Sequence, residues 1–217
     1  MCGRFALVAS ESEIVNHFHL KTAFSMRPRY NIAPGATIPA VLPGGRVEFF
    51  EWGFTPSWRK VEEGKLPQRF INARIESILD KPTFKQAFKT RRCLVPGSGY
   101  FEWKQIHDRK QPFYIFSEQQ PLLGLAAIWE MWRAPEGHHL ETLAIITKTA
   151  DENLQAVHDR MPVVIAKEDY AHWLDPKANT DALIELSNKT LVKFKFHPVP
   201  TAVNNPRFDQ AACIESL

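Results

Sequence analysis

The sequence has few cysteines and no long apolar run. Its three cysteines stand far apart, at Cys2, Cys93 and Cys213, and this odd, scattered set argues against a disulfide framework. No CxxC pair occurs and the histidines lack zinc-ligand spacing, so no metal centre or other cofactor is expected. No apolar stretch approaches the roughly 20 residues of a membrane span, and the first residues do not form a signal peptide. These absences predict a soluble, cytoplasmic protein.

The composition is that of a folded chain with a mild positive charge. Hydrophobic residues make up 44% of the 217 residues, which argues against disorder and is enough for a sizeable core. The net charge is +3 and the acidic residues are spread along most of the chain. Nucleic-acid binding is therefore permitted but not required, and any surface for it must be local.

Local patterns predict short strands with interspersed helices. Ser10 and Glu13 form a capping box at the start of a helix, and Pro43-Gly44-Gly45 marks a hairpin turn. The predicted strands are 5–8, 37–42, 46–52, 92–95, 100–105, 112–116, 123–132, 142–148 and 192–197. Helices are predicted after Ser10 and at 73–79, 83–88, 152–158, 167–174 and 180–187, and loops at 21–35 and 53–68.

The order of these elements indicates the fold class. Helices and strands do not alternate regularly as in βαβ units, which favours an α+β fold. We expect a single domain over residues 1–217, with a curled, largely antiparallel, barrel-like sheet and peripheral helices.

Cys2 is the first candidate for chemistry. A small second residue usually allows removal of the initiator Met1, which would leave cysteine as the N-terminal residue. Such a terminus carries an amine and a thiol, with ordinary pKa values near 8 and 8.5. The amine can form a Schiff base with an aldehyde, and the thiol can then close a thiazolidine ring in an intramolecular step. The alternative is that Cys2 is an incidental second residue.

Glu102 is the second candidate, in a strand that follows a glycine-rich turn. On this strand Tyr100, Glu102 and Lys104 share one face, opposite Phe101 and Trp103. A carboxyl group beside bulky rings has a raised pKa, which suits acid–base catalysis. The alternative is a salt-bridged surface glutamate with Trp103 in the core.

Asn72 and His158 complete the set. The Asn72 amide can orient a substrate hydroxyl, or it can cap the helix predicted after it. His158 ends a predicted helix and can titrate near neutral pH, or it can be structural or solvent-facing. Arginines stand beside three of the four candidates, as expected for carbonyl capture near a phosphodiester backbone.

These segments resemble the SOS response-associated peptidase (SRAP) family, also called abasic site processing proteins. The blocks that carry the resemblance are MCGRF (1–5), YNIAPG (30–35), WGFTPSW (52–58), INARIES (71–77), RRCLVPGSGYFEWK (91–104), QPFYI (111–115), LAAIWE (125–130), TKTA (147–150), HDRMPVVI (158–165) and HPV (197–199). They span nearly the whole chain in order.

The resemblance implies roles for particular residues. Catalysis falls on Cys2, Asn72, Glu102 and His158, with no departure from the family pattern. The positions that match DNA contacts in the family are Arg4, Pro34, Trp58, Arg74, Trp103 and Arg160. The loop at 59–67 looks variable, so nothing is carried over there.

The implied function is a response to DNA damage. The protein would sense an abasic site in single-stranded DNA, including one at a single-strand/duplex junction. After Met1 removal, Cys2 would form a covalent thiazolidine crosslink that shields the lesion, with a weak lyase side activity. We expect a monomer with DNA as its partner.

Two other readings stay open at this point. The first is a thiol peptidase that uses Cys2 and His158 as nucleophile and base, a hydrolase activity that the family's older name suggests. A peptidase would turn over many peptides, whereas a capture protein makes one adduct per molecule. The second is a passive nucleic-acid-binding module, whose affinity would survive substitution of Cys2.

Overall fold

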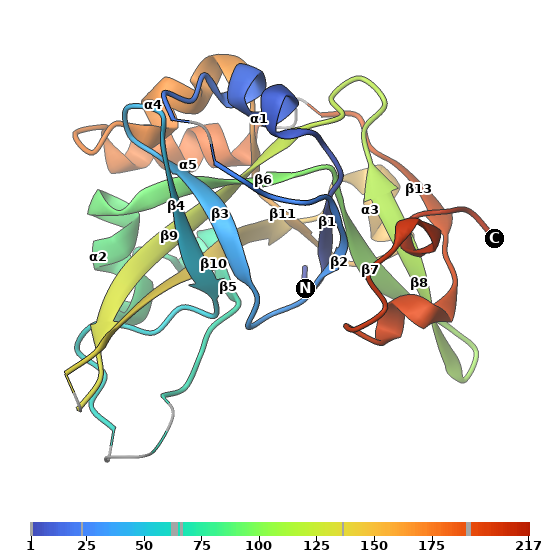
Figure 1. The fold of residues 1–217 in the computed structure, drawn as a ribbon, viewed down its shortest axis with the longest axis horizontal. Helices are drawn as coiled ribbons and strands as arrows, with labels where there is room; N and C mark the ends of the chain where they lie inside the picture. Colours follow the sequence, from blue (N-terminus) through green and yellow to red (C-terminus); the bar gives the residue numbers. More distant parts are fainter. Residues whose placement is uncertain (1, 23, 62–64, 66, 136, 190–191) are drawn as a thin grey trace.

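The computed structural model describes residues 2–22, 24–61, 65, 67–135, 137–189 and 192–217. The elements labelled in Figure 1 include five α-helices, α1 Glu11–Phe18, α2 Pro82–Thr90, α3 Glu152–Gln155, α4 Tyr170–Leu174 and α5 Thr180–Asn188, among the residues described. The strands of this part are β1 Phe5–Leu7, β2 Arg29–Ile32, β3 Thr37–Leu42, β4 Arg46–Trp52, β5 Asn72–Arg74, β6 Arg92–Gly97, β7 Gly99–Ile106, β8 Arg109–Phe116, β9 Leu123–Arg133, β10 His139–Thr149, β11 Arg160–Pro162, β12 Val164–Ile165 and β13 Lys195–Pro198. Short 3₁₀ turns are η1 Ile75–Ser77, η2 Lys167–Asp169, η3 Thr201–Asn204 and η4 Ala211–Cys213.

Five strands close into a barrel in the order β10-β4-β3-β6-β9 and back to β10. The hairpin of β3 and β4 turns at Gly44 and Gly45, both at positive φ, which glycine adopts without steric cost. The neighbours in the barrel are antiparallel except β4 and β10, and β5 adds a second parallel pairing along β10. The α+β fold with a curled, largely antiparallel sheet is thereby confirmed.

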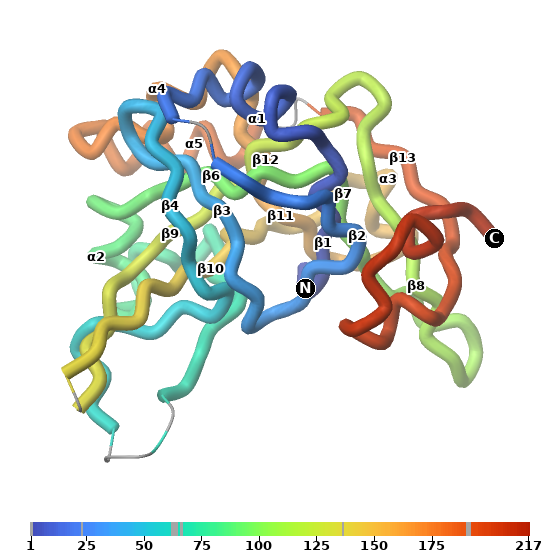
Figure 2. Tube along the Cα trace, viewed as in Figure 1, coloured from blue at the N-terminus to red at the C-terminus, as the bar shows by residue number. Residues whose placement is uncertain are grey.

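A second sheet leans against the barrel and carries the start of the chain. Its order is β13-β8-β7-β1-β2. Phe5 pairs with Tyr100, and the Phe101 N–H donates to the Arg4 carbonyl oxygen at 2.9 Å. When this antiparallel register is continued from Phe5 toward the N-terminus, Cys2 lies beside the part of β7 that carries Glu102. In the sheet β1 lies between β2 and β7, and Figure 2 shows it close to the N-terminus.

Helices and aromatic side chains fill the space around the barrel. In Figure 1, α1, α4 and α5 gather at one end of the molecule, and α2 lies on the side of β9. The Ser10–Glu13 capping box is present at α1. One large apolar cluster includes Phe5 and Trp52, whose rings meet edge to face with centroids 5.4 Å apart. None of the helices in the described part is long and apolar enough to cross a membrane.

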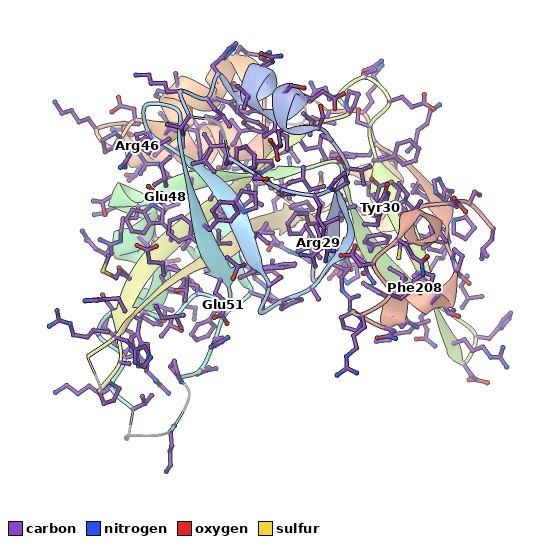
Figure 3. All side chains as sticks on the ribbon, in the orientation of Figure 1. Arg29, Tyr30, Arg46, Glu48, Glu51 and Phe208 are labelled. Carbon is purple, nitrogen blue, oxygen red and sulfur yellow. The ribbon has the colours of Figure 1, made fainter. Side chains whose placement is uncertain are left out.

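The segment 21–35, predicted as a loop, contains β2. This strand has little hydrophobic periodicity of its own. It is held by Asp209, which pairs with Arg29 and accepts the backbone N–H groups of Tyr30 and Asn31 at 2.6 and 2.9 Å. Figure 3 shows Arg29 and Tyr30 on the side of the molecule that also carries Phe208. The strand therefore depends on residues at the far end of the sequence.

The prediction of a helix at 73–79 is wrong. Residues 72–74 form β5, paired in parallel with β10, and only a 3₁₀ turn follows. The short strands β11 and β12 were not predicted, because three and two residues carry no periodic signal. The strand predicted at 192–197 begins later, at Lys195. In each case pairing with a distant strand decided the local structure.

Gly99 is expected to be intolerant of any side chain. An added Cβ would lie 2.5 Å from the Tyr114 ring and 2.6 Å from the Ile115 carbonyl oxygen, so β7 and β8 would have to separate. We expect Gly99→Ala to cost about 1–3 kcal/mol and to lower Tm by roughly 2–12 °C. Gly97→Ala is the matched control, since its Cβ would meet only side chains, that of Leu125 at 3.2 Å and the Phe5 ring at 3.7 Å, and no backbone atom closer than these. Equal Tm values for the two variants would contradict this account.

Candidate functional site

Cys2 lies buried beside β7 as a free thiol. It is 0% exposed, and its Sγ is 4.0 Å from the Arg4 carbonyl oxygen. Burial, and secondarily the Glu102 carboxylate, raises the pKa of the Cys2 thiol far above its ordinary range. The sulfur is therefore held as a neutral thiol at neutral pH. Met1, whose removal the sequence predicts, lies outside the described residues.

Glu102 is a buried carboxyl group on β7. It is 2% exposed, whereas the neighbouring Trp103 is partly exposed, so the alternative of a surface glutamate beside a core Trp103 is wrong. Burial, together with the negative charge of Asp159, raises the pKa of Glu102 to about 7. A carboxyl group with this pKa can both give and take a proton at neutral pH.

His158 faces Glu102 from the turn that leads into β11. Its Nε2 is 3.7 Å from Glu102 Oε2. Two groups address Nδ1: the Arg160 backbone N–H donates to it at 3.0 Å, and an Asp159 carboxylate oxygen lies at 2.8 Å. The hydrogen bond from the Arg160 N–H requires an unprotonated Nδ1, as in the neutral ring. The short contact with the Asp159 carboxylate favours the protonated ring. Partial burial lowers the pKa of His158 despite Asp159, so the ring is neutral and basic at neutral pH.

Asn72 stands on β5, at the edge of β10. Its Nδ2 donates to the Ile145 carbonyl oxygen at 3.4 Å. Its Oδ1 is buried and has no hydrogen-bond partner in the part of the chain described. Asn72 does not cap a helix, because Arg74 precedes the 3₁₀ turn. A buried acceptor oxygen without a protein partner is expected at a site where a ligand donates a hydrogen bond to it.

The Arg4 and Trp103 side chains lie against each other close to Cys2. One Arg4 guanidinium nitrogen donates to Asn31 Oδ1 and to the Val203 carbonyl oxygen, both at 2.7 Å. The guanidinium lies 5.9 Å from the centre of the Trp103 ring. Both of these partners, within the part of the chain that the structure describes, are neutral, so they fix the guanidinium in place without cancelling its positive charge.

Arg160 differs, because its charge is already balanced. Its guanidinium donates to both carboxylate oxygens of Glu76, at 2.6 and 2.9 Å. Partial burial acts to raise the pKa of Glu76, but the hydrogen bonds from Arg160 outweigh it and lower that pKa to about 2. Arg74 is exposed, and no carboxylate within the described ranges forms an ion pair with it.

Pro34 and Trp58, both matched to DNA contacts by resemblance, are exposed. Pro34 lies in the turn between β2 and β3. Trp58 is 58% exposed and follows β4, beside a hollow of about 380 Å³ that Trp132 and Arg133 also line. Trp58 does not line the pocket at Glu102 and His158.

An open pocket of about 450 Å³ joins Glu102 and His158 to the surface. It is lined by Glu102, Trp103, Lys110, His158 and Asn204. Sequence reasoning missed Lys110 and Asn204. The two-residue turn of the β7–β8 hairpin could have placed Lys110 by register, but nothing local indicates Asn204.

The structure thus brings Cys2, Glu102 and His158 together, with Arg4 and Trp103 alongside. Asn72 lies on β5, which pairs with β10. Tyr100, fully buried on the Glu102 face of β7, adds a hydroxyl without a hydrogen-bond partner among the described residues. Burial, with Cys2 and Glu102, raises the pKa of Tyr100, so it remains a donor. The residues described contain no group of three His, Cys, Asp or Glu side chains placed to hold a metal ion.

Comparison with known proteins gives consistent matches over the chain. A family model described as SOS response associated peptidase (SRAP) matches residues 1–206. The chain is 33% identical to the abasic site processing protein YoqW of Bacillus subtilis and 31% identical to the abasic site processing protein YedK of Escherichia coli, with 100% of both chains covered in each case. The X-ray structure of a Bacteroides thetaiotaomicron protein, 23% identical, superposes with a TM-score of 0.88 over 100% of both chains and shows the same fold.

Proposed function

The chain belongs to the SOS response associated peptidase (SRAP) family, and on this basis we propose that it captures abasic sites of single-stranded DNA as a covalent adduct of Cys2. The names of its relatives support abasic-site processing as the task. The observation that carries the proposal is a buried Cys2 thiol beside a carboxyl group whose pKa is about 7 and a neutral imidazole. This set serves proton transfer during addition to a carbonyl group.

The reaction needs the amine of Cys2, which becomes free when Met1 is removed. The ring-opened abasic sugar presents an aldehyde. The Cys2 nitrogen adds to the aldehyde carbon to give a carbinolamine, which loses water and becomes an imine. The Cys2 sulfur then adds to the imine carbon, its proton passes to the nitrogen, and a thiazolidine closes. One water is lost overall, and no oxidant or reductant is required.

Glu102 and His158 carry the protons in this proposal. Neutral His158 accepts a proton from the attacking amine, and Asp159 then stabilises the charged ring across 2.8 Å. Glu102, close to half protonated near pH 7, delivers a proton to the leaving hydroxyl of the carbinolamine. Both steps take place in a largely buried site, where charge interactions are strong.

The remaining predicted residues would bind the DNA strand. Asn72 offers its buried, unused Oδ1 to the sugar hydroxyl. Arg4, Arg74 and Arg160 lie near backbone phosphates and read no bases, so binding should be tolerant of sequence and sensitive to salt. Arg160 can reach a phosphate only by sharing or leaving Glu76.

The exposed rings extend the proposed DNA-binding surface. Trp103 would stack against a base next to the lesion, and Pro34 and Trp58 would limit entry of a duplex at a single-strand/duplex junction. We place the protein with DNA in the cytoplasm, acting as a monomer without a cofactor.

The proposal predicts a defined change of mass. After incubation with an abasic oligonucleotide, intact-mass spectrometry should show the chain without Met1 plus one strand, less one water. We expect a stoichiometry that stops at one adduct per molecule, because the product blocks its own nucleophile. The matched control is the same oligonucleotide with the aldehyde reduced by borohydride, which should give no adduct. Unchanged protein mass with the abasic strand would refute covalent capture.

Lyase activity is a side reaction of the same imine. If the thiol does not close the ring, a base can remove the proton next to the imine carbon and the strand breaks by β-elimination. His158 and Glu102 stand close to one another and can serve as that base. A thiol peptidase is less well supported, because burial keeps Cys2 protonated, whereas a peptidase nucleophile needs a thiolate.

A further inference from the structure

The pocket at Glu102 and His158 has a lysine at its rim for which the catalytic steps have no use. We infer that Lys110 binds a backbone phosphate of the strand directly beside the abasic sugar. This inference rests on the proposed function and deepens it, since it assigns the direction in which the DNA backbone leaves the site. The ligand class is a phosphodiester, and Lys110 acts as its counter-charge.

Strand register places Lys110 next to Trp103. In the β7–β8 hairpin Trp103 pairs with Pro112, and Gln105 pairs with Lys110. Residues two apart on a strand share a face, and paired residues point to the same side. Lys110 is therefore the diagonal neighbour of Trp103 on one face of the hairpin. Arg109, its neighbour in sequence, points to the opposite face.

The pocket lining agrees with a shared face for Lys110 and Trp103, and it also includes Glu102 from the other face of β7. Lys110, Trp103 and Asn204 line the same hollow of about 450 Å³ as Glu102 and His158. A hollow of this volume falls in the range of small-ligand sites, roughly 300–1,000 Å³. The hollow opens onto Glu102, which neighbours Cys2, so the phosphodiester attached to a sugar at this site is expected to lie along the hollow.

Charge makes Lys110 the suitable partner there. Glu102 and Asp159 give this region negative charge, which would repel a phosphate. Arg160 does not neutralise this negative charge, because its guanidinium is already paired with the Glu76 carboxylate at 2.6 and 2.9 Å. Lys110 is exposed and makes no ion pair with a carboxylate of the described chain. It is thus a cation at the pocket rim whose charge remains available.

The Trp103 wall of the pocket is fixed in orientation. Trp103 Nε1 donates to Asn204 Oδ1 at 2.7 Å, and the Arg4 guanidinium lies on the ring. A ring held in this way gives a defined surface for the sugar or base of the adjoining nucleotide, with Lys110 at its edge. The phosphate contact is therefore expected at one position of the strand, not spread over many.

The test compares Lys110→Ala with Arg109→Ala, which removes the same charge from the neighbouring position of β8, a residue that does not line the pocket. Binding is measured over a range of salt concentrations, with a single strand that carries tetrahydrofuran in place of the abasic sugar. We expect Lys110→Ala to weaken binding about 3- to 10-fold and to reduce the salt slope by about 0.7. Arg109→Ala should change the slope by much less. Equal effects of the two variants, or no effect of Lys110→Ala, would overturn the inference.

A second arm locates the phosphate. Neutral methylphosphonates replace the phosphates on either side of the tetrahydrofuran, one at a time. The wild-type protein should lose affinity at one of these positions, and Lys110→Ala should lose nothing further there. A full additional loss in Lys110→Ala would overturn the assignment. Since tetrahydrofuran has no aldehyde, these results do not depend on the adduct. Failure of the wild type to crosslink a true abasic strand would count against the proposed function alone.

Discussion

Cys2→Ala is expected to form no heat-stable adduct with an abasic single strand. The sulfur of Cys2 closes the ring, and without it the reaction stops at an imine that water reverses. Intramolecular ring closure has a large advantage over any reaction in solution, so the loss of stable product should be at least about 100-fold. Denaturing gel electrophoresis after heating measures the remaining adduct.

Cys2→Ser is the matched control, because it exchanges one atom and keeps the amine. We expect both variants to give a band only when borohydride traps the imine, and neither to give a heat-stable band without it. Binding of a strand without an aldehyde should remain close to wild type in both. Full heat-stable crosslinking by Cys2→Ala would exclude the thiazolidine, and loss of all binding would indicate that the residue is structural.

Glu102→Gln is expected to slow adduct formation by about 100-fold, the lower end of what acid–base groups contribute. Glutamine keeps the shape and the burial of Glu102 but neither donates nor accepts a proton in the reaction. Single-turnover crosslinking at saturating DNA, followed against pH, gives the rate. The wild-type profile should change near pH 7, where Glu102 titrates, and the variant should lose this change. An unaltered rate or profile would remove Glu102 from the mechanism.

The same substitution has a second, separable effect on stability. Burial raises the pKa of Glu102 from 4.5 to about 7, so the folded state binds a proton more tightly than the unfolded state. Between these two pH values the free energy of unfolding of the wild type falls as pH rises. The loss is on the order of 3 kcal/mol above pH 7.

Glutamine carries no such charge, so the variant should match the wild type near pH 4.5 and become the more stable protein at pH 8. Chemical denaturation at both pH values measures the difference. Lower stability of Glu102→Gln at pH 8 would mean that the ionised carboxylate is stabilised by its surroundings, contrary to the raised pKa.

Sequence patterns located the elements whose signals are local. The hairpin of 37–42 and 46–52 follows from Pro43-Gly44-Gly45, and the start of α1 follows from Ser10 and Glu13. The long strands β9 and β10 carry enough apolar residues to be recognised. By contrast, β2 is held by Asp209, and no local pattern in Arg-Tyr-Asn-Ile indicates a strand.

Within the candidate site, the strand alternation of Tyr100 and Glu102 was readable, and the buried environment of Glu102 followed from its aromatic neighbours. The pairing of Arg160 with Glu76 was not readable, because the two residues are 84 positions apart. Asn204 reaches the pocket only through the chain's return past β7, whereas the register of the β7–β8 hairpin could have placed Lys110. The role of residues within one segment could be predicted from the sequence. Contacts between residues of distant segments could be seen only in the folded structure.

The hydrogen bonds of Asn31 and Arg4 have a consequence for biosynthesis. Asn31 donates to the carbonyl oxygens of Val203, Asn205 and Phe208, and Arg4 donates to Val203 across 199 positions of sequence. At about 5–20 residues per second, the ribosome makes the last of these partners roughly 10–40 s after Cys2. A nascent chain therefore carries its nucleophile long before its arginine is anchored, and reactivity toward DNA should appear only once translation has passed residue 208.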